Sequence, residues 1–243
     1  MQTDTILHSL TQVTRERAAR AADAALQDAV VRLKSYQQER FRNTYRDLLD
    51  DPRYAAATRF FLEELYGPAD HTLRDREFER IVPAIARLFP RQVVATVNAL
   101  AELHALSERL DTEMGRKLKS KAAIAPADYV AAWQATDQRA DRERQIALAL
   151  EIGAALDHYT RSPLLRRSLH LMRRPARAAG LETLQGFLER GFDAFGTLGG
   201  AASFLATIES RERSLAAALF EPALAAGPSP SAPGLRAAWE QLP

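Results

Sequence analysis

The chain of 243 residues is 47% hydrophobic and 26% charged, which fits a folded globular domain and excludes an intrinsically disordered chain. Its 33 basic and 31 acidic side chains leave a formal net charge of +2, so any charged partner must be recognised by a local patch. The absence of cysteine excludes disulfides, thiolate metal sites and cysteine nucleophiles.

The beginning of the chain and its hydropathy favour a cytoplasmic protein. The residues after Met1 are polar and lack the apolar core and the small-residue cleavage pattern of a secretory signal. No run of about 18 apolar residues occurs, so no ordinary membrane-spanning helix is expected. We therefore expect a soluble protein of the cytoplasm.

Helical periodicity dominates the first 51 residues, which contain neither glycine nor proline. A continuous helix of this length would extend roughly 70 Å at 1.5 Å per residue, longer than a compact domain of this size. We expect either a protruding helix or two helices, with the break in the alanine- and arginine-rich stretch 15–22. The apolar positions that carry the pattern are Ile6, Leu10, Val13, Leu26, Val30, Leu33, Phe41, Tyr45 and Leu48.

Prolines and glycines divide the remaining chain into further helices. Pro52 marks one helix start, and Pro83 predicts a kink or a split inside the next helix. Ser162 and Pro163 have the pattern of an N-cap followed by proline at the first helical position. Residues 115–126 form a basic connector, and no strand-like alternation is found. The expected helices cover residues 52–66, 74–88, 91–114, 126–159 as one helix or two, 163 to between 175 and 180, 181–198 and 201–220.

The C-terminal segment is predicted to be separate from the helices. Residues 221–234 contain four prolines among alanine, glycine and serine, a composition that buries too little surface to order itself. Leu235, Trp239 and Leu242 then follow at the i, i+4 and i+7 spacing of a short amphipathic helix. These anchors either dock into a partner or fold back onto the chain's own core. We expect an all-α protein, with a single multi-helix bundle of long helices over residues 1–220 and a flexible, disordered proline-rich tail over residues 221–243.

Two stretches resemble an uncharacterised family of proteobacterial all-helical proteins. Residues 60–67 read Phe-Phe-Leu-Glu-Glu-Leu-Tyr-Gly, a Phe-Phe-Leu-x-x-Leu-Tyr-Gly motif, and residues 184–192 form the second stretch. The resemblance covers most of residues 50–220. It implies a single helical unit, and it implies neither an activity nor a site.

Histidines lie beside carboxylates on two of the long predicted helices. His104, Glu108 and Asp111 share one helical stripe, while Glu151 and His158 share another. If the stripes faced each other across the bundle, His104, Glu108, Glu151 and His158 could bind iron, manganese or zinc. The competing interpretation is solvated or capping side chains, because the repeated Glu-x-x-His of di-iron bundles is missing. Phosphate-binding glycine loops, dinucleotide fingerprints, serine elbows and His-Glu-x-x-His are also missing.

A pocket for a haem or a bilin is a related hypothesis. An all-helical domain can enclose a flat apolar ligand between aromatic side chains and beside an axial histidine. Aromatic residues at helical spacing are equally typical of a hydrophobic core, so the sequence identifies no cofactor. The aromatic residues concerned are Phe60, Phe61, Phe187, Phe192 and Phe195.

The strongest anomaly in the sequence is basic. No acidic residue occurs between Asp157 and Glu182, and within this interval Leu165, Leu169 and Met172 share one helical face beside a polar ridge. Arginine binds phosphate and carboxylate groups in a bidentate manner, and the basic connector could extend the patch. The alternative is that these arginines pair with the protein's own carboxylates. The candidate anion-binding residues are Arg161, Arg166, Arg167, His170, Arg173, Arg174 and Arg177.

These patterns favour a non-enzymatic helical binding or regulatory protein that engages an anionic macromolecule through the arginine-rich helix. A partner protein is the first expectation, with nucleic acid and a second copy of the chain left open. The alternative is a helical-bundle protein that binds a metal or a tetrapyrrole, with oxidase chemistry as one outcome. Whether the chain is an enzyme therefore stays open.

Overall fold

A computed structural model describes residues 2–65, 71–227 and 232–243. All regular secondary structure in these ranges is helical, as expected for an all-α protein. Tyr66 and Gly67 of the Phe-Phe-Leu motif, and Pro228 and Pro230 of the predicted tail, lie outside the described residues. Within the described ranges, no helix is long and apolar enough to span a lipid bilayer.

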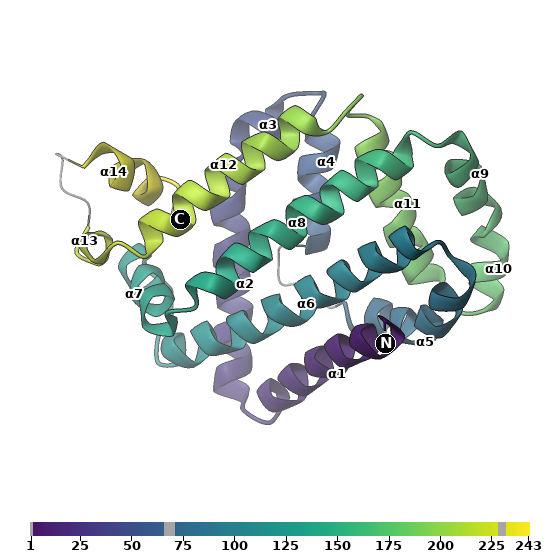
Figure 1. The fold of residues 1–243 in the computed structure, drawn as a ribbon. Helices are drawn as coiled ribbons and strands as arrows, with labels where there is room; N and C mark the ends of the chain where they lie inside the picture. The colour runs from purple at the N-terminus through teal and green to yellow at the C-terminus, as the bar shows by residue number, and fades with distance from the viewer. Residues whose placement is uncertain (1, 66–70, 228–231) are drawn as a thin grey trace.

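Long helices form the centre of the molecule. Helices α6 (Arg91–Leu118), α8 (Arg139–Thr160) and α12 (Ala202–Leu219) run diagonally across Figure 1, where α8 packs between the other two. Helix α1 (Gln2–Ala21) packs along α6, and α2 (Ala24–Thr44) crosses behind it. The expected bundle of long helices is therefore confirmed.

The first 51 residues contain a break, as their length requires. The break falls at Ala22 and Asp23, at the end of the predicted stretch, and the Asp23 carboxylate caps α2 by accepting a hydrogen bond from the Leu26 N–H at 3.2 Å. Helix α1 therefore continues through the arginines that were expected to interrupt it. This places Arg17 and Arg20 on a regular helical face against α6.

Short helices connect the long ones. Helix α3 (Arg46–Asp50) is followed by α4 (Ala55–Phe60), which continues into one π-helical turn, η1 (Phe61–Leu65). Helix α5 (Thr72–Leu88) runs through Pro83 without the expected split. Pro83 is exposed, so the hydrogen bond that proline cannot donate is lost on the side facing solvent. Helix α7 (Pro126–Thr136) is separate from α8, which resolves the alternative left open for residues 126–159.

Three helices lie close together on the right of Figure 1. They are α9 (Pro163–Leu171), α10 (Arg173–Ala178) and α11 (Glu182–Gly196). The single helix expected from Pro163 onwards is divided at Met172. Pro175 explains the division, because it cannot donate the bond to the Leu171 carbonyl that a continuous helix requires.

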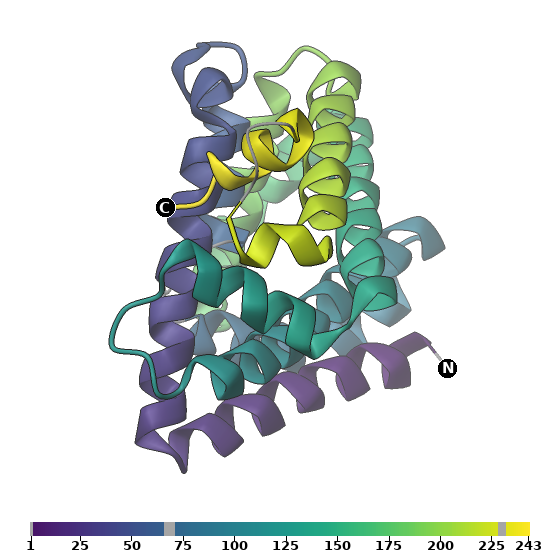
Figure 2. The same ribbon diagram turned by 90° about the vertical axis from the view of Figure 1, so that its left-hand side faces the viewer.

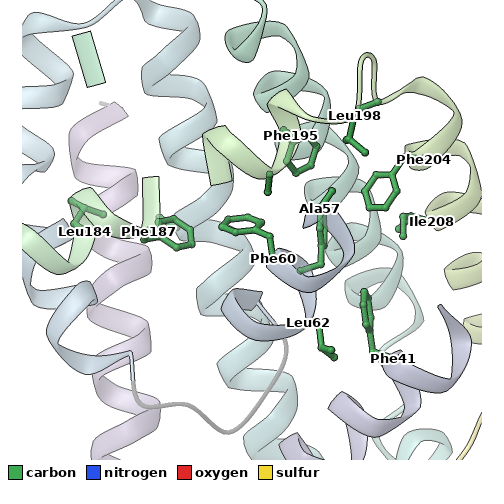
Figure 3. Close-up of a cluster of buried hydrophobic side chains, with 14 of the residues drawn as sticks. Phe41, Ala57, Phe60, Leu62, Leu184, Phe187, Phe195, Leu198, Phe204 and Ile208 are labelled. Atoms are coloured by element: carbon green, nitrogen blue, oxygen red, sulfur yellow. The ribbon is translucent and has the colours of Figure 1, made fainter. Parts of the chain in front are cut away.

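Aromatic side chains fill the main hydrophobic core between α4, α11 and α12. The rings of Phe60 and Phe187 lie 5.5 Å apart, and those of Phe61 and Phe195 lie 6.0 Å apart. Figure 3 shows Phe60 pointing toward Phe187 within this cluster. A Cβ atom at Gly191 would come within 2.8 Å of the Phe60 ring, so glycine permits this close approach.

The C-terminal segment folds back onto the domain. Helices α13 (Pro222–Ala225) and α14 (Pro233–Trp239) pack against α7 and α12, and Figure 2 shows them in yellow between α2 and α12. Leu224 and Leu242 are buried in a second core cluster, against which Leu235 and Trp239 also pack. The Thr44 hydroxyl donates to Gln241 Oε1 at 2.9 Å. The described part of this segment therefore differs from the expected flexible tail. The composition argument for disorder did not account for the surface that α7 and α12 offer to its few apolar anchors.

Replacing Leu224 by alanine tests whether this segment contributes to stability. Leu224 is fully buried, so Leu224→Ala should lower the free energy of unfolding by about 2–4 kcal/mol. Leu164→Ala is the control, because Leu164 is exposed and its loss should change stability by less than about 0.5 kcal/mol. The measurement is chemical denaturation followed by circular dichroism. Equal stability of the two variants would contradict the docked tail.

Candidate functional site

The predicted basic interval forms an exposed surface on α9 and α10. The Ser162 hydroxyl accepts the Leu165 N–H at 3.4 Å, and Pro163 occupies the first helical position, as the sequence indicated. Helix α9 buries none of its residues. We call this region the arginine surface, and it comprises Arg161, Arg166, Arg167, His170, Arg173, Arg174 and Arg177.

Part of the arginine surface pairs with carboxylates of the same chain. Arg173 Nε lies 2.7 Å from Glu189 Oε1, and Arg177 Nη2 lies 2.7 Å from Glu182 Oε1. The side chains of these two arginines remain 57% and 76% exposed. Arg161 pairs with Asp157 at 2.5 Å in the same manner. Exposed ion pairs of this kind contribute about 0–1 kcal/mol each, so these pairs orient the guanidinium groups without withdrawing them from solvent.

The other arginines are placed differently. Arg166 lies over the Phe192 ring, with its guanidinium carbon 5.7 Å from the ring centroid. Within the described residues, Arg167 and Arg174 form no ion pair, and both are exposed. His170 Nδ1 lies 4.0 Å from the Glu189 carboxylate. Some of these arginines, but not all of them, therefore pair with the protein's own carboxylates.

Large apolar side chains are exposed on α9 and directly after it. Leu164 is 73% exposed and Leu171 is 77% exposed, and Met172 between α9 and α10 is half exposed. An exposed apolar patch beside charged residues is a common mark of an interaction surface. The surface therefore offers both charge and apolar contact area.

The basic connector does not extend this surface. Its first residues form the last turn of α6 and the rest lead to α7, at the opposite end of the molecule from α9 in Figure 1. Two of its lysines already pair with local carboxylates, Lys119 with Asp23 at 2.6 Å and Lys121 with Asp128 at 2.7 Å. The fold thus keeps the two basic segments apart.

The four residues named as metal ligands are not gathered around one point. His104 and Glu108 face the interior from α6, whereas Glu151 and His158 on α8 are exposed. In the described ranges, no group of three or more histidine and carboxylate side chains is arranged to hold a metal ion. The phenylalanines considered for a haem or bilin pocket pack ring against ring in the core instead.

A buried cluster of charged groups, which the sequence did not predict, surrounds Glu108. The Glu108 carboxylate accepts hydrogen bonds from Arg20 Nη2, from Lys34 Nζ at 2.9 Å and from Arg17 Nη2 at 3.3 Å. Its side chain is 3% exposed and that of Arg20 is 4% exposed. Arg20 also donates to the Thr112 hydroxyl at 2.8 Å. Helices α1, α2 and α6 therefore meet at one carboxylate.

Asp75 on α5 extends this cluster. Its Oδ2 atom lies 2.8 Å from Arg17 Nη1 and 2.9 Å from His104 Nε2. Arg74 Nε lies 3.7 Å from Asp75 Oδ1, and the Arg74 guanidinium covers the Phe187 ring with its carbon 4.6 Å from the centroid. Arg17 is thus shared between two carboxylates on different helices.

A second polar group lies toward α12. Arg40 Nη1 donates to Glu212 Oε1 at 2.6 Å, and the Tyr45 hydroxyl donates to the same atom at 2.8 Å. Asp111, one turn beyond Glu108 on α6, accepts from Gln37 Nε2 at 3.2 Å. Ionisable side chains therefore lie in the interior both beside α6 and beside α12.

Many of these groups, though not Arg17 or Arg20, line an interior cavity of about 120 Å³. Helices α2, α5, α6, α7, α8, α11 and α12 contribute to its wall. Its apolar wall includes Leu103, Leu184 and Phe187, and the side chains of Lys34 and His104 remain 20% exposed at its edge. Both side chains are therefore accessible to solvent.

Two carboxylates in the cavity wall have opposite pKa shifts. Burial alone would raise the pKa of Glu108, but Lys34, Arg20 and His104 lower it well below its usual range. Burial raises the pKa of Asp111, and the nearby Glu108 charge adds to the increase while Lys34 opposes it. Burial also lowers the pKa of His71 to about 4, so its imidazole is neutral at pH 7.

The sequence contained a weak signal for this cluster. His104, Glu108 and Asp111 share one helical stripe in the sequence, and all three line the cavity. The sequence did not predict their partners Arg20 and Lys34, because a charged residue in a helical pattern normally marks the solvent face. Only the packing of α1 and α2 on α6 shows that these cations are internal.

Comparison with known proteins gives one match. The family model described as Domain of unknown function (DUF8198) matches residues 16–225, most of the chain, and the chain therefore belongs to that family. No curated protein and no solved structure matches it. The match agrees with the resemblance to an uncharacterised family and includes both the arginine surface and the interior cavity.

Replacing Glu108 by glutamine tests the buried cluster. Glu108→Gln keeps the shape but leaves Arg20 and Lys34 without their carboxylate, so the free energy of unfolding should fall by about 3–5 kcal/mol. Glu113→Gln on the same helix breaks the surface pair with Arg109 and should cost less than about 1 kcal/mol. The measurement is urea denaturation at pH 7.

The same variant should show a pH dependence. Because folding lowers the pKa of Glu108, the contribution of this carboxylate to the free energy of unfolding is present above its unfolded-state pKa. The loss of stability in the glutamine variant should therefore shrink below about pH 4. A deficit that does not depend on pH would contradict this assignment.

Asp111 should show the opposite behaviour. Because folding raises its pKa, its contribution to stability is greatest when it is protonated and is lost as pH rises through the folded-state pKa. Asp111→Asn should therefore raise the melting temperature at pH 8 and leave it nearly unchanged at pH 4. Thermal unfolding across this pH range measures the difference. A variant less stable than the parent at pH 8 would show that the ionised carboxylate is favoured.

Proposed function

We propose that this member of the DUF8198 family is a non-enzymatic helical binding or regulatory protein that docks an acidic partner protein on α9 and α10. The observation that carries the proposal is the exposure of Leu164 and Leu171 beside the arginine surface on a helix that buries none of its own residues. The proposed setting is the cytoplasm, as expected from the sequence.

Charge supports an anionic partner. The acid-free interval concentrates arginines on two consecutive helices, and their internal pairs are exposed and individually weak. A partner carboxylate can replace Glu182 or Glu189 at little cost and form the bidentate contacts that arginine favours. The ion pairs with the chain's own carboxylates then hold the guanidinium groups ready in the unbound state.

Apolar contact area supports a protein partner over nucleic acid. A nucleic-acid backbone is recognised through phosphates and gains little from exposed leucines. A protein interface combines a central apolar contact with arginine and methionine, which are enriched in such interfaces. Leu164, Leu171 and Met172 fit the second description. In the described residues, no observation favours the metal or tetrapyrrole alternative.

Matched variants on and off the surface test the proposal. The charge variant is Arg166→Glu/Arg173→Glu/Arg177→Glu, and the apolar variant is Leu164→Gln/Leu171→Gln. The controls are Arg116→Glu on α6 and Leu73→Gln on α5, which change exposed residues of the same types elsewhere. The proteins retained by each immobilised variant from an extract of the source cells are identified, in rising salt.

We expect a partner retained by the parent and by both controls to be lost from both surface variants, and to be released as salt rises. Circular dichroism should show unchanged folding in all variants. Binding of duplex DNA and of anionic vesicles is measured in parallel, and sedimentation reports a second copy of the chain as partner. If DNA or vesicles bind to the apolar variant as well as to the parent while no retained protein depends on the surface, a protein partner is wrong.

A further inference from the structure

Four cations and five carboxylates line the interior cavity. Two more cations lie outside the wall and pair with its carboxylates, which brings the cations to six against five carboxylates. The cations are Arg17, Arg20, Lys34, Arg40, Arg74 and Arg142. The carboxylates are Glu64, Asp75, Glu108, Asp111 and Glu212.

Sharing of carboxylates shows the same excess. Three cations contact Glu108, and Arg17 is divided between Glu108 and Asp75. Arg74 is held only loosely, at 3.5 Å from Glu64 Oε2 and 3.7 Å from Asp75 Oδ1. Since a buried positive charge is costly without a counter-charge, an anion in the cavity would lower the free energy of the folded protein.

The cavity wall also contains a buried donor without an acceptor. Trp133 on α7 is 8% exposed, and its Nε1 atom is buried and has no hydrogen-bond partner among the described residues. Buried indole N–H groups normally have a partner, so an acceptor brought by a ligand would complete this one. Arg142 lies over the Trp133 ring, with its guanidinium carbon 3.9 Å from the ring centroid. The Arg142 guanidinium and the indole N–H of Trp133 thus lie together at this wall.

Apolar side chains occupy much of the rest of the wall, so a bare inorganic ion would leave a large part of it uncovered. Phe78, Leu103, Leu184 and Phe187 line one part, and Leu215 and Leu219 of α12 line another. Ligand pockets in proteins typically combine such an apolar lining with a few placed polar groups.

We propose that the interior cavity is a binding site for a small organic anion, a carboxylate or a phosphate ester with an apolar body. Lys34 at the cavity edge supplies the positive charge nearest solvent, and Trp133 supplies a hydrogen-bond donor. The apolar body lies against the leucines and phenylalanines of the wall. This site is distinct from the arginine surface and does not depend on the partner proposed for that surface.

A ligand series at constant ionic strength tests the site. The probes are benzoate, hexanoate, phenyl phosphate, inorganic phosphate and hexylammonium, with the melting temperature and the Trp133 fluorescence as readouts. Trp239→Phe is the background, because it removes the second tryptophan of the chain. The organic anions should raise the melting temperature and change the fluorescence, with hexylammonium and inorganic phosphate having little effect. A preference between benzoate and phenyl phosphate tells a carboxylate ligand from a phosphate ester.

Variants locate the bound anion. Lys34→Met and Trp133→Phe should each weaken binding about tenfold, as expected for the loss of one charged or buried hydrogen bond. Lys119→Met, an exposed lysine on the connector, is the control and should bind like the parent. Because Lys34→Met also removes a contact to Glu108, its folding is checked by circular dichroism, and Trp133→Phe provides the independent measurement.

Two outcomes would overturn the inference. One is that no organic anion in the series binds better than hexylammonium. The other is that anion binding survives both cavity variants and is lost when Arg166, Arg173 and Arg177 are reversed, which would assign it to the arginine surface. Neither outcome would decide whether a partner protein docks on α9 and α10.

Discussion

Burying a carboxylate costs several kcal/mol unless cations accompany it, and Glu108 meets this condition only where α1, α2 and α6 come together. Arg17 and Arg20 arrive from α1 and Lys34 from α2. Each of these side chains would be left partly unpaired if its helix were displaced along α6. The ion cluster therefore determines the relative position of the three helices, while the apolar contacts around it supply most of the stabilisation.

The rest of the molecule is arranged around this junction. Helix α6 also packs against α8, which packs against α12, and the interior cavity lies among these helices. The same junction brings positive charge to the cavity, since Lys34 and Arg17 contact carboxylates that line it. Positioning of the helices and the electrostatics of the cavity thus have a common origin. The arginine surface on α9 and α10 lies at one end of the molecule and is built from different residues.

The helices could be predicted from the sequence because their signals are local. Periodic apolar residues, the Ser162 cap and the prolines at helix starts determine most of the observed boundaries. The charged interior could not be predicted, since the burial of Arg20 depends on α6, whose contacts with it lie 88 or more residues away. The ion pair of Arg173 could not be predicted either, because its partner Glu189 lies on a different helix, α11. The packing of the described C-terminal residues could not be predicted either, because composition does not show that α7 and α12 offer them a surface.

The contact between Thr44 and Gln241 joins residues 197 positions apart in the sequence. Such a contact closes a long loop, and the entropy lost in closing it must be recovered from interactions that form late. Helical proteins commonly fold fast because their contacts are local, and a closure of this length works against that tendency. Leu224 and Leu242 are buried in the second core. We therefore expect the assembly of this core to be the rate-limiting step of folding.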